Sequence, residues 1–168
     1  MEHRTTDLLA LAEQLAKECH AGQTDKAGAA YWMHPQRVSQ GCASDEARIA
    51  GWLHDLIEDT DTTAEELLTL GFPPDVVAAV QLDTRRVDES YMDYIQRIVD
   101  ACDSQDPAVA RAGRIAREVK MNDLRDNMNL DRLPTVTDTD RARVEKYRAA
   151  YSVLENSCAP APGIDATR

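Results

Sequence analysis

A concentration of groups that could bind a metal ion occurs at positions 50–60, which read Ala-Gly-Trp-Leu-His-Asp-Leu-Ile-Glu-Asp-Thr. If this stretch is helical, His54 lies above Glu58 and Asp55 above Asp59, because residues four apart share one face of a helix. One imidazole and three carboxylates would then crowd a turn and a half, where the carboxylates repel one another. A divalent cation is the simplest partner for such a cluster. The pattern therefore predicts a metal-dependent hydrolase.

Two of the four histidines stand beside other groups that could do chemistry. His54 belongs to the acidic cluster. His34 precedes Pro35, a residue that favours the first position of a helix, so His34 is expected at a helix mouth. His20 is expected to close the first helix, where an imidazole commonly interacts with the helix dipole alone. His34 and His54 are therefore the candidate ligands.

A third group of polar residues occupies positions 119–127, Val-Lys-Met-Asn-Asp-Leu-Arg-Asp-Asn. On a helix, Asp123 and Asn127 share one face, and Lys120 lies one turn before them. The pattern alone favours a solvated face on which Lys120 pairs with Asp123, an arrangement that contributes little stability. A functional role requires this helix to pack against the one that carries His54, which spacing along the chain does not reveal.

The elements that must position these residues are predicted to be helices throughout. Apolar residues recur at helical spacing, and residues that begin or end helices stand at the boundaries. The pattern predicts a compact all-α bundle of about seven or eight helices. The expected helices run from the cap region at 5–7 to Gly22, from Pro35 to about Gly41, from Ser44 through the acidic cluster, from Thr63 to Gly71, from Pro73 to about Leu82, from Ser90 to about Val99, from Pro107 to about Leu130, and from about Thr139 to Glu155.

The composition supports a helical protein and narrows its partners. Apolar residues make up 43% of the chain and aromatic residues 5%, and a core of Leu, Ala, Val and Ile suits helices better than sheets. A formal net charge of −11 argues against binding to nucleic acid or an acidic membrane, but leaves room for an anionic small molecule. The four cysteines form no Cys-x-x-Cys pair, so neither a disulfide framework nor a zinc–thiolate site is expected.

The chain is expected to be a single cytoplasmic domain. Its N-terminus has no signal-peptide layout, and no apolar run approaches the ~20 residues needed to span a bilayer. We expect residues 1–156 to form the domain and residues 157–168 to be a disordered tail.

Four separated segments carry a family resemblance. They are positions 20–35 with the His-Pro pair, 51–60 with His-Asp and Glu-Asp, 89–97, and 119–127 with the late Asp-x-x-x-Asn. Together, and in this order, they resemble the HD-domain superfamily, specifically its RelA/SpoT-like hydrolase branch and the small stand-alone alarmone hydrolases. An isolated His-Asp dipeptide would carry no information, but the combination is specific.

The resemblance implies a helical bundle that holds one metal ion through His34, His54, Asp55 and Asp123. Mn²⁺ is the usual ion of the family. Two imidazoles and two carboxylates without a thiolate suit Mn²⁺ or Fe²⁺, and Zn²⁺ is also compatible. The implied reaction removes the 3′-pyrophosphate from guanosine 3′,5′-bis(diphosphate), releasing GDP and pyrophosphate.

Further residues have implied roles in catalysis and substrate binding. Glu58 and Asp59 belong to the catalytic motif and would handle protons beside the ion, although Glu58 could instead only orient His54. Lys26 and Asn127 would bind the nucleotide. The alternatives are an ordinary exposed lysine and an ordinary helix-surface amide. Among the aromatic residues, Tyr31 is the one most expected near the pocket.

Two positions depart from the family pattern. Asp25 stands beside Lys26, where many family members carry two adjacent basic residues, so a negative charge lies next to the expected polyphosphate. Asn122 stands where the family usually has a small apolar residue, so the packing behind Asp123 is expected to differ.

Several other functions remain open at this point. The nearest is an HD phosphohydrolase acting on another pyrophosphorylated nucleotide or on NADPH. Two histidines and carboxylates on iron could also activate oxygen. A non-catalytic nucleotide-binding sensor is a third alternative. The oligomeric state does not follow from the sequence.

Overall fold

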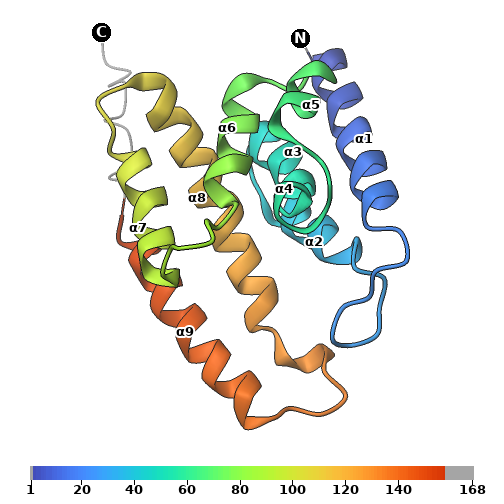
Figure 1. The fold of residues 1–168 in the computed structure, drawn as a ribbon, viewed down its shortest axis with the longest axis vertical. Helices are drawn as coiled ribbons and strands as arrows, with labels where there is room; N and C mark the ends of the chain where they lie inside the picture. The colour runs from blue at the N-terminus through green and yellow to red at the C-terminus, as the bar shows by residue number, and fades with distance from the viewer. Residues whose placement is uncertain (1, 158–168) are drawn as a thin grey trace, which may run out of the picture.

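In the computed structural model, which describes residues 2–157, the regular elements are nine α-helices and one short 3-10 helix (Figure 1). Over these residues there is no β-strand, and only Thr24 and Ala30 form an isolated bridge. The predicted all-α fold is confirmed. The elements are α1 (Glu2–Cys19), α2 (Met33–Gly41), α3 (Asp45–Leu53), α4 (Leu56–Asp59), α5 (Ala64–Thr69), α6 (Pro74–Asp83), α7 (Tyr91–Cys102), α8 (Pro107–Met128), η1 (Leu130–Arg132) and α9 (Asp138–Glu155).

Most helices begin where the cap residues predict. The side chains of Ser44 and Ser90 accept backbone N–H groups at the starts of α3 and α7. Thr63 and Glu66 form a reciprocal capping box at the start of α5. The first helix differs, because α1 already begins at Glu2, upstream of the cap region expected at 5–7.

The central helix also differs from the prediction, because it is divided. α3 ends at Leu53, a turn follows, and α4 is a single helical turn. The carbonyl of Gly51 is the acceptor that the N–H of Asp55 would use in a continuous helix, and His54 Nδ1 lies 2.9 Å from it. A side chain that bonds to the backbone in this way competes with the helix. The division raises the number of helices to nine and leaves His54 in the turn and Glu58 in α4, where the sequence predicted one continuous helix.

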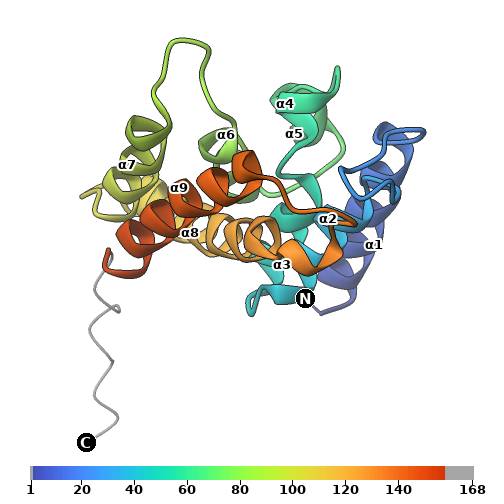
Figure 2. The ribbon, with the colours of Figure 1, turned by 90° about the horizontal axis from the view of Figure 1, so that it is seen from below.

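The longest helix, α8, lies at the centre of the packing. It contacts α2 and α3 on one side and α6, α7 and α9 on the others. Its buried side includes Ile115, Ala116, Val119 and Leu124. Figure 2 shows α9 running along α8, while α4 and the connection between α6 and α7 project from the same side of the molecule. The contact between α8 and α3 meets the condition for a functional role of positions 119–127.

Two further sequence predictions concern membrane-spanning helices and the C-terminal tail. None of the helices in the described part is long and apolar enough to cross a membrane. Of the tail expected at 157–168, only Ser157 belongs to the described residues, and its hydroxyl donates to the carbonyl of Leu154 at 2.7 Å. The rest of that segment lies outside them.

Candidate active site

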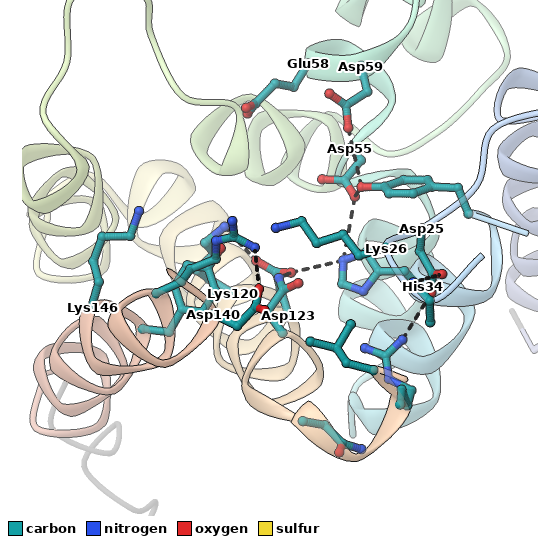
Figure 3. Close-up of a pocket in the computed structure, with 18 of the residues that line it drawn as sticks. Asp25, Lys26, His34, Asp55, Glu58, Asp59, Lys120, Asp123, Asp140 and Lys146 are labelled. Atoms are coloured by element: carbon teal, nitrogen blue, oxygen red, sulfur yellow. Dashed lines mark hydrogen bonds and ion pairs between the residues drawn. The ribbon is translucent and has the colours of Figure 1, made fainter. Parts of the chain in front are cut away.

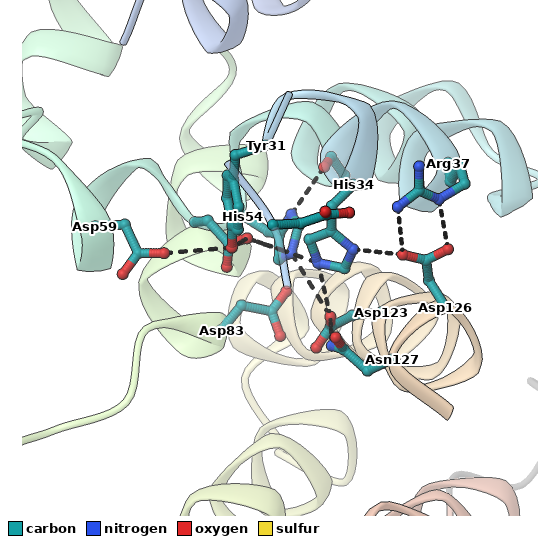
Figure 4. A network of polar contacts seen from close by, with 12 residues as sticks. Tyr31, His34, Arg37, His54, Asp59, Asp83, Asp123, Asp126 and Asn127 are labelled. Atoms are coloured by element: carbon teal, nitrogen blue, oxygen red, sulfur yellow. Dashed lines mark hydrogen bonds and ion pairs between the residues drawn. The ribbon is translucent and has the colours of Figure 1, made fainter. Parts of the chain in front are cut away.

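Three elements bring the four predicted ligands together: α2 carries His34, the turn between α3 and α4 carries His54 and Asp55, and α8 carries Asp123 (Figure 3 for Asp55, Figure 4 for the others). His34 Nε2 lies 3.1 Å from Asp123 Oδ1 and 3.7 Å from Asp55 Oδ2. His54 Nε2 lies 3.1 Å from the same Asp55 oxygen and 3.9 Å from the same Asp123 oxygen. Of the described residues, His34, His54 and Asp123 form the group whose ligand atoms all lie within 4.8 Å of one another. Asp55 borders this group through the two imidazoles.

The hydrogen bonds behind the histidines orient them for metal binding. His34 Nδ1 lies 2.7 Å from Asp126 Oδ2, and His54 Nδ1 lies 2.9 Å from the carbonyl of Gly51. An ionised carboxylate and a carbonyl can only accept, so Nδ1 carries the proton in each ring and Nε2 faces the cluster. His54 Nε2 is buried and has no hydrogen-bond partner. This unpartnered nitrogen, together with the two carboxylates, fits a divalent metal ion.

The charges of the cluster also favour a cation. Burial opposes the positive charge on His34, but its hydrogen bonds to Asp123 and Asp126 raise its pKa to about 10. Burial would also raise the pKa of Asp123, yet Lys120 and His34 hold it well below its usual value. The carboxylates thus attract positive charge to the position between the imidazoles. A metal ion could supply that charge in place of a proton.

Asp126 supports His34 from the outside of the cluster. Its carboxylate accepts hydrogen bonds from Arg37 Nε at 2.6 Å and from Arg37 Nη2 and Arg132 Nη2 at 3.0 Å each. Although burial opposes this charge, the bonds to His34 and Arg37 lower the pKa of Asp126 to about 2. Sequence reasoning missed this role. Asp126 follows Asp123 by three residues on the same helix, and this spacing was the available signal.

Tyr31 and the acidic pair of α4 border the cluster on the side away from α8. The Tyr31 hydroxyl donates to Asp55 Oδ2 at 2.7 Å and lies 3.4 Å from Asp59 Oδ2. Burial, with the charges of Asp55 and Glu58, raises the pKa of Asp59 above its usual value. Glu58 accepts a hydrogen bond from the backbone N–H of Arg85 at 3.0 Å. Figure 3 shows both carboxylates on α4 at one edge of a cavity.

This cavity has a volume of about 500 Å³ and opens over the cluster. It is lined by all the predicted site residues except His54, including Lys26 and Asn127. The Asn127 amide donates to Asp123 Oδ1. Lys120 Nζ lies 2.7 Å from Asp123 Oδ2, so the predicted ion pair is present, but the prediction of a solvated face was wrong because Asp123 is buried in the bundle.

Six cationic side chains line the cavity, and sequence reasoning did not single out the three from η1 and α9. They come from the first loop, the connection after α6, α8, η1 and α9, and so from distant parts of the chain. On α9, the spacing of Arg143, Lys146 and Tyr147 places them on one face, which was a usable signal. The six are Lys26, Arg85, Lys120, Arg132, Arg143 and Lys146.

The structure accounts for both departures from the family pattern. Asp25 Oδ1 accepts the backbone N–H groups of Ala27 and Ala29 at 2.9 Å, and Oδ2 lies 3.3 Å from Arg132 Nη1. The negative charge at position 25 is therefore paired. Behind Asp123, the Asn122 amide donates to the carbonyl of Glu118 at 2.9 Å, so a hydrogen bond forms where the family usually packs a small apolar residue.

The sequence of this chain is similar to a known protein family and to two known proteins. A family model described as HD domain matches residues 12–121. Over 60 residues, the chain is 45% identical to the guanosine-3′,5′-bis(diphosphate) 3′-pyrophosphohydrolase of Aquifex aeolicus (strain VF5), a match covering 33% of this chain and 9% of that protein. Over 67 residues, it is 40% identical to the probable guanosine-3′,5′-bis(diphosphate) 3′-pyrophosphohydrolase of a Synechocystis strain, a match covering 38% of this chain and again 9% of the relative.

A solved structure shares the fold over most of the chain. It is described as a metazoan ortholog of SpoT that hydrolyzes ppGpp and plays a role in starvation responses. The two structures superimpose with a TM-score of 0.65, covering 90% of this chain and 88% of the other, at 24% sequence identity. At this level of identity the likeness shows a common fold.

Proposed function

The chain belongs to the HD-domain family, and from this membership we propose that it is a metal-dependent phosphohydrolase that removes the 3′-pyrophosphate from guanosine 3′,5′-bis(diphosphate). The observation that carries the proposal is the cluster of His34, His54, Asp55 and Asp123 beneath a cavity lined by cations. The names of the two curated relatives support the choice of substrate.

We propose His34, His54, Asp55 and Asp123 as the ligands of one ion. Nitrogen and carboxylate donors without a thiolate suit Mn²⁺, the ion we expect, and are compatible with Fe²⁺ or Zn²⁺. When bound, such an ion would polarise a phosphoryl oxygen and acidify a coordinated water molecule. The hydrogen bonds to Nδ1 of each histidine would keep Nε2 available for it.

The substrate would lie in the cavity, with its phosphates among the basic side chains. Lys26 from the first loop and Arg143 and Lys146 from α9 line the cavity, where they could pair with the phosphates of a bound nucleotide. Asn127 would contact the nucleotide with its amide while also orienting Asp123, to which it donates a hydrogen bond.

Glu58 and Asp59 would handle the protons of the reaction. The pKa of Asp59 is raised by burial and by the neighbouring charges of Asp55 and Glu58, which favours a proton on this carboxyl group. Asp59 could therefore deliver a proton to the leaving oxygen, while Glu58 accepts one from the attacking water. Both side chains stand at the open edge of the cavity, where they can exchange protons with solvent.

The direct test is release of pyrophosphate from guanosine tetraphosphate by the purified protein, with Mn²⁺ and with a chelator. We expect GDP and pyrophosphate only with the ion, and no release by an Asp123→Asn variant. If the ion binds but nothing is released, another pyrophosphorylated nucleotide or NADPH becomes the candidate substrate. Nucleotide binding without turnover in saturating Mn²⁺ would contradict the hydrolase and support a nucleotide-binding sensor.

A further inference from the structure

Asp83 is a buried acidic residue at the edge of the metal cluster that sequence reasoning did not single out. It ends α6, is 4% exposed, and both of its carboxyl oxygens are buried without a hydrogen-bond partner. Its backbone carbonyl accepts a hydrogen bond from the Tyr94 hydroxyl at 2.7 Å, so the position of the residue is well defined. Asp83 lines the same cavity as Asp55 and Asp123. In Figure 4 its side chain points toward the cluster that contains His54 and Asp123.

A buried carboxyl group without a partner opposes folding, because it loses its hydration and gains no bond in return. Unsatisfied groups of this kind are rare in folded proteins and call for an explanation. Lys120, the cation that acts most strongly on the charge of Asp83, gives it no hydrogen bond and contacts Asp123 Oδ2 at 2.7 Å instead. Arg97 is likewise engaged, with Glu89 at 2.7 Å. Neither cation forms a hydrogen bond with Asp83, so both of its carboxyl oxygens are left without a direct partner.

The charges around Asp83 indicate a divalent cation. Burial raises the pKa of Asp83 well above its usual value, Lys120 opposes this shift, and Asp123 and Asp55 add to it. When Asp55, Asp83 and Asp123 are ionised, Lys120 is protonated and both imidazoles are neutral, as metal binding requires, the group carries a formal charge of −2. One divalent ion between the histidines would bring this charge to zero. Without the ion, the buried carboxyl group of Asp83 has neither a hydrogen bond nor an ion pair of its own.

We propose that Asp83 is a third carboxylate of the metal site, which strengthens the binding of the divalent ion through its charge without ligating it. Unlike Asp55, it forms no ion pair with either imidazole, so its effect acts across space or through intervening water. The inference rests on the proposed metal site and adds a positioning and affinity-determining residue to it.

This role predicts effects of opposite sign on stability and on metal affinity. In the metal-free protein, Asp83→Leu removes an uncompensated buried carboxyl group, and the unfolding temperature should rise. In the metal-bound protein, the same change removes a compensating negative charge, and Mn²⁺ should bind more weakly. A residue with a purely structural role would instead lower the unfolding temperature when replaced and leave the affinity for Mn²⁺ unchanged.

The test compares the wild type with Asp83→Leu and Asp83→Asn, using calorimetric titration with Mn²⁺ and thermal unfolding of the chelated proteins. Asp83→Asn keeps the shape of the side chain, so it reports on affinity even if leucine packs poorly. We expect both variants to bind Mn²⁺ about tenfold more weakly, and Asp83→Leu to unfold at a higher temperature than the wild type when no ion is bound. Asp103→Asn, which removes an exposed carboxylate away from the cavity, should change neither quantity.

Unchanged Mn²⁺ affinity in both Asp83 variants would overturn the inference while leaving the metal site intact. A wild type that binds no Mn²⁺, Fe²⁺ or Zn²⁺ would instead refute the metal site itself, and the role of Asp83 with it. The two failures are distinguishable because the wild-type titration is read independently of the variants.

Discussion

At the scale of single residues, the cluster depends on groups that hold its histidines from behind. Asp126 fixes His34 and the carbonyl of Gly51 fixes His54, so both Nε2 atoms face the same point. Groups that orient metal ligands in this way commonly change metal affinity when they are altered.

Asp126→Asn should therefore weaken Mn²⁺ binding by about 10- to 100-fold. The amide would no longer hold the His34 proton with a charged acceptor, and its interaction with Arg37 would also weaken. Calorimetric titration of the protein, after a chelator has removed bound metal, measures the change in Mn²⁺ affinity. Asp103→Asn serves as a control for the loss of one negative charge. An Asp126→Asn variant with wild-type affinity would show that His34 does not depend on this support.

Glu58→Gln separates proton transfer from metal binding. The side chain is exposed, and its only hydrogen bond given by the described residues is with the N–H of Arg85, which a glutamine oxygen can also accept. If Glu58 handles a proton, the variant should release pyrophosphate from guanosine tetraphosphate about 10²- to 10⁴-fold more slowly than the wild type. Its affinity for Mn²⁺ should be unchanged. A variant that retains its full rate would assign Glu58 to a supporting role.

Sequence patterns could predict which residues share the site only where the signal is local. Local patterns singled out His34, His54 and Asp55, whereas Asp123 was assigned to the same site by the family resemblance, and the structure brings all four together. Asp83 and Asp126 could not be predicted in the same way. The contact of Asp126 with His34 joins residues 92 positions apart. Nothing in the sequence around Asp83 marks it as a site residue, and only its burial in the structure singles it out.

At the scale of elements, the close approach of α2 and α3 aligns the two histidines. Gly51 on α3 faces the backbone of Ser39 on α2, and a Cβ atom at position 51 would lie 2.9 Å from both the Cα and the N atoms of Ser39. The same residue supplies the carbonyl that holds His54. Gly51 therefore both permits the close approach of α2 and α3 and holds His54 in the metal cluster.

Gly51→Ala should lower the free energy of unfolding by about 1–3 kcal/mol, because α2 and α3 must separate to admit the methyl group. The shift would also move His54, so the variant should bind Mn²⁺ more weakly. Urea unfolding and metal titration measure the two effects. If both stay at wild-type values, the approach of the two helices does not limit the site.

The connection between α6 and α7 depends on an ion pair that responds to acid. Arg97 bonds to Glu89 and to the carbonyls of Leu82 and Thr84. The hydrogen bond from Arg97 lowers the pKa of Glu89 to about 2, below its usual 4.5. Because the pKa is lower in the folded state, the stabilisation is fully present above about pH 4.5 and is lost as the pH falls through about 2.

Glu89→Gln should therefore destabilise the protein at neutral pH, and the difference from the wild type should shrink as the pH falls from about 4.5 to 2. Chemical unfolding at a series of pH values measures this difference. A gap between the two proteins that stays constant down to pH 2 would contradict the role of the Glu89 charge.

Cap chemistry predicted most helix boundaries, but it could not predict the division of the central helix. That division accompanies a bond between an imidazole and a backbone carbonyl, which competes with the helical pattern that its sequence otherwise favours. The contribution of α9 to the cavity was missed for another reason. Its basic residues look like an ordinary solvated face until the helix is seen beside α8.

At the scale of the whole molecule, the distribution of charge matters more than its sum. The net charge of −11 argued against nucleic acid and acidic membranes and left room for an anionic small molecule, and basic side chains line one cavity. Composition could predict the absence of a general attraction to nucleic acid, whereas a local site for an anionic nucleotide depends on which elements meet. The helical bundle brings these elements together by packing them around α8.

The central claim is that one divalent ion at this cluster enables hydrolysis of a pyrophosphorylated nucleotide. The most direct measurement titrates the chelated protein with Mn²⁺ while following both ion binding and pyrophosphate release from guanosine tetraphosphate. We predict that release begins with the first ion bound and reaches its maximum at one ion per chain, and that His54→Ala abolishes both signals. Release that is equally fast in the chelated protein, or in His54→Ala, would contradict the assignment of the reaction to this site.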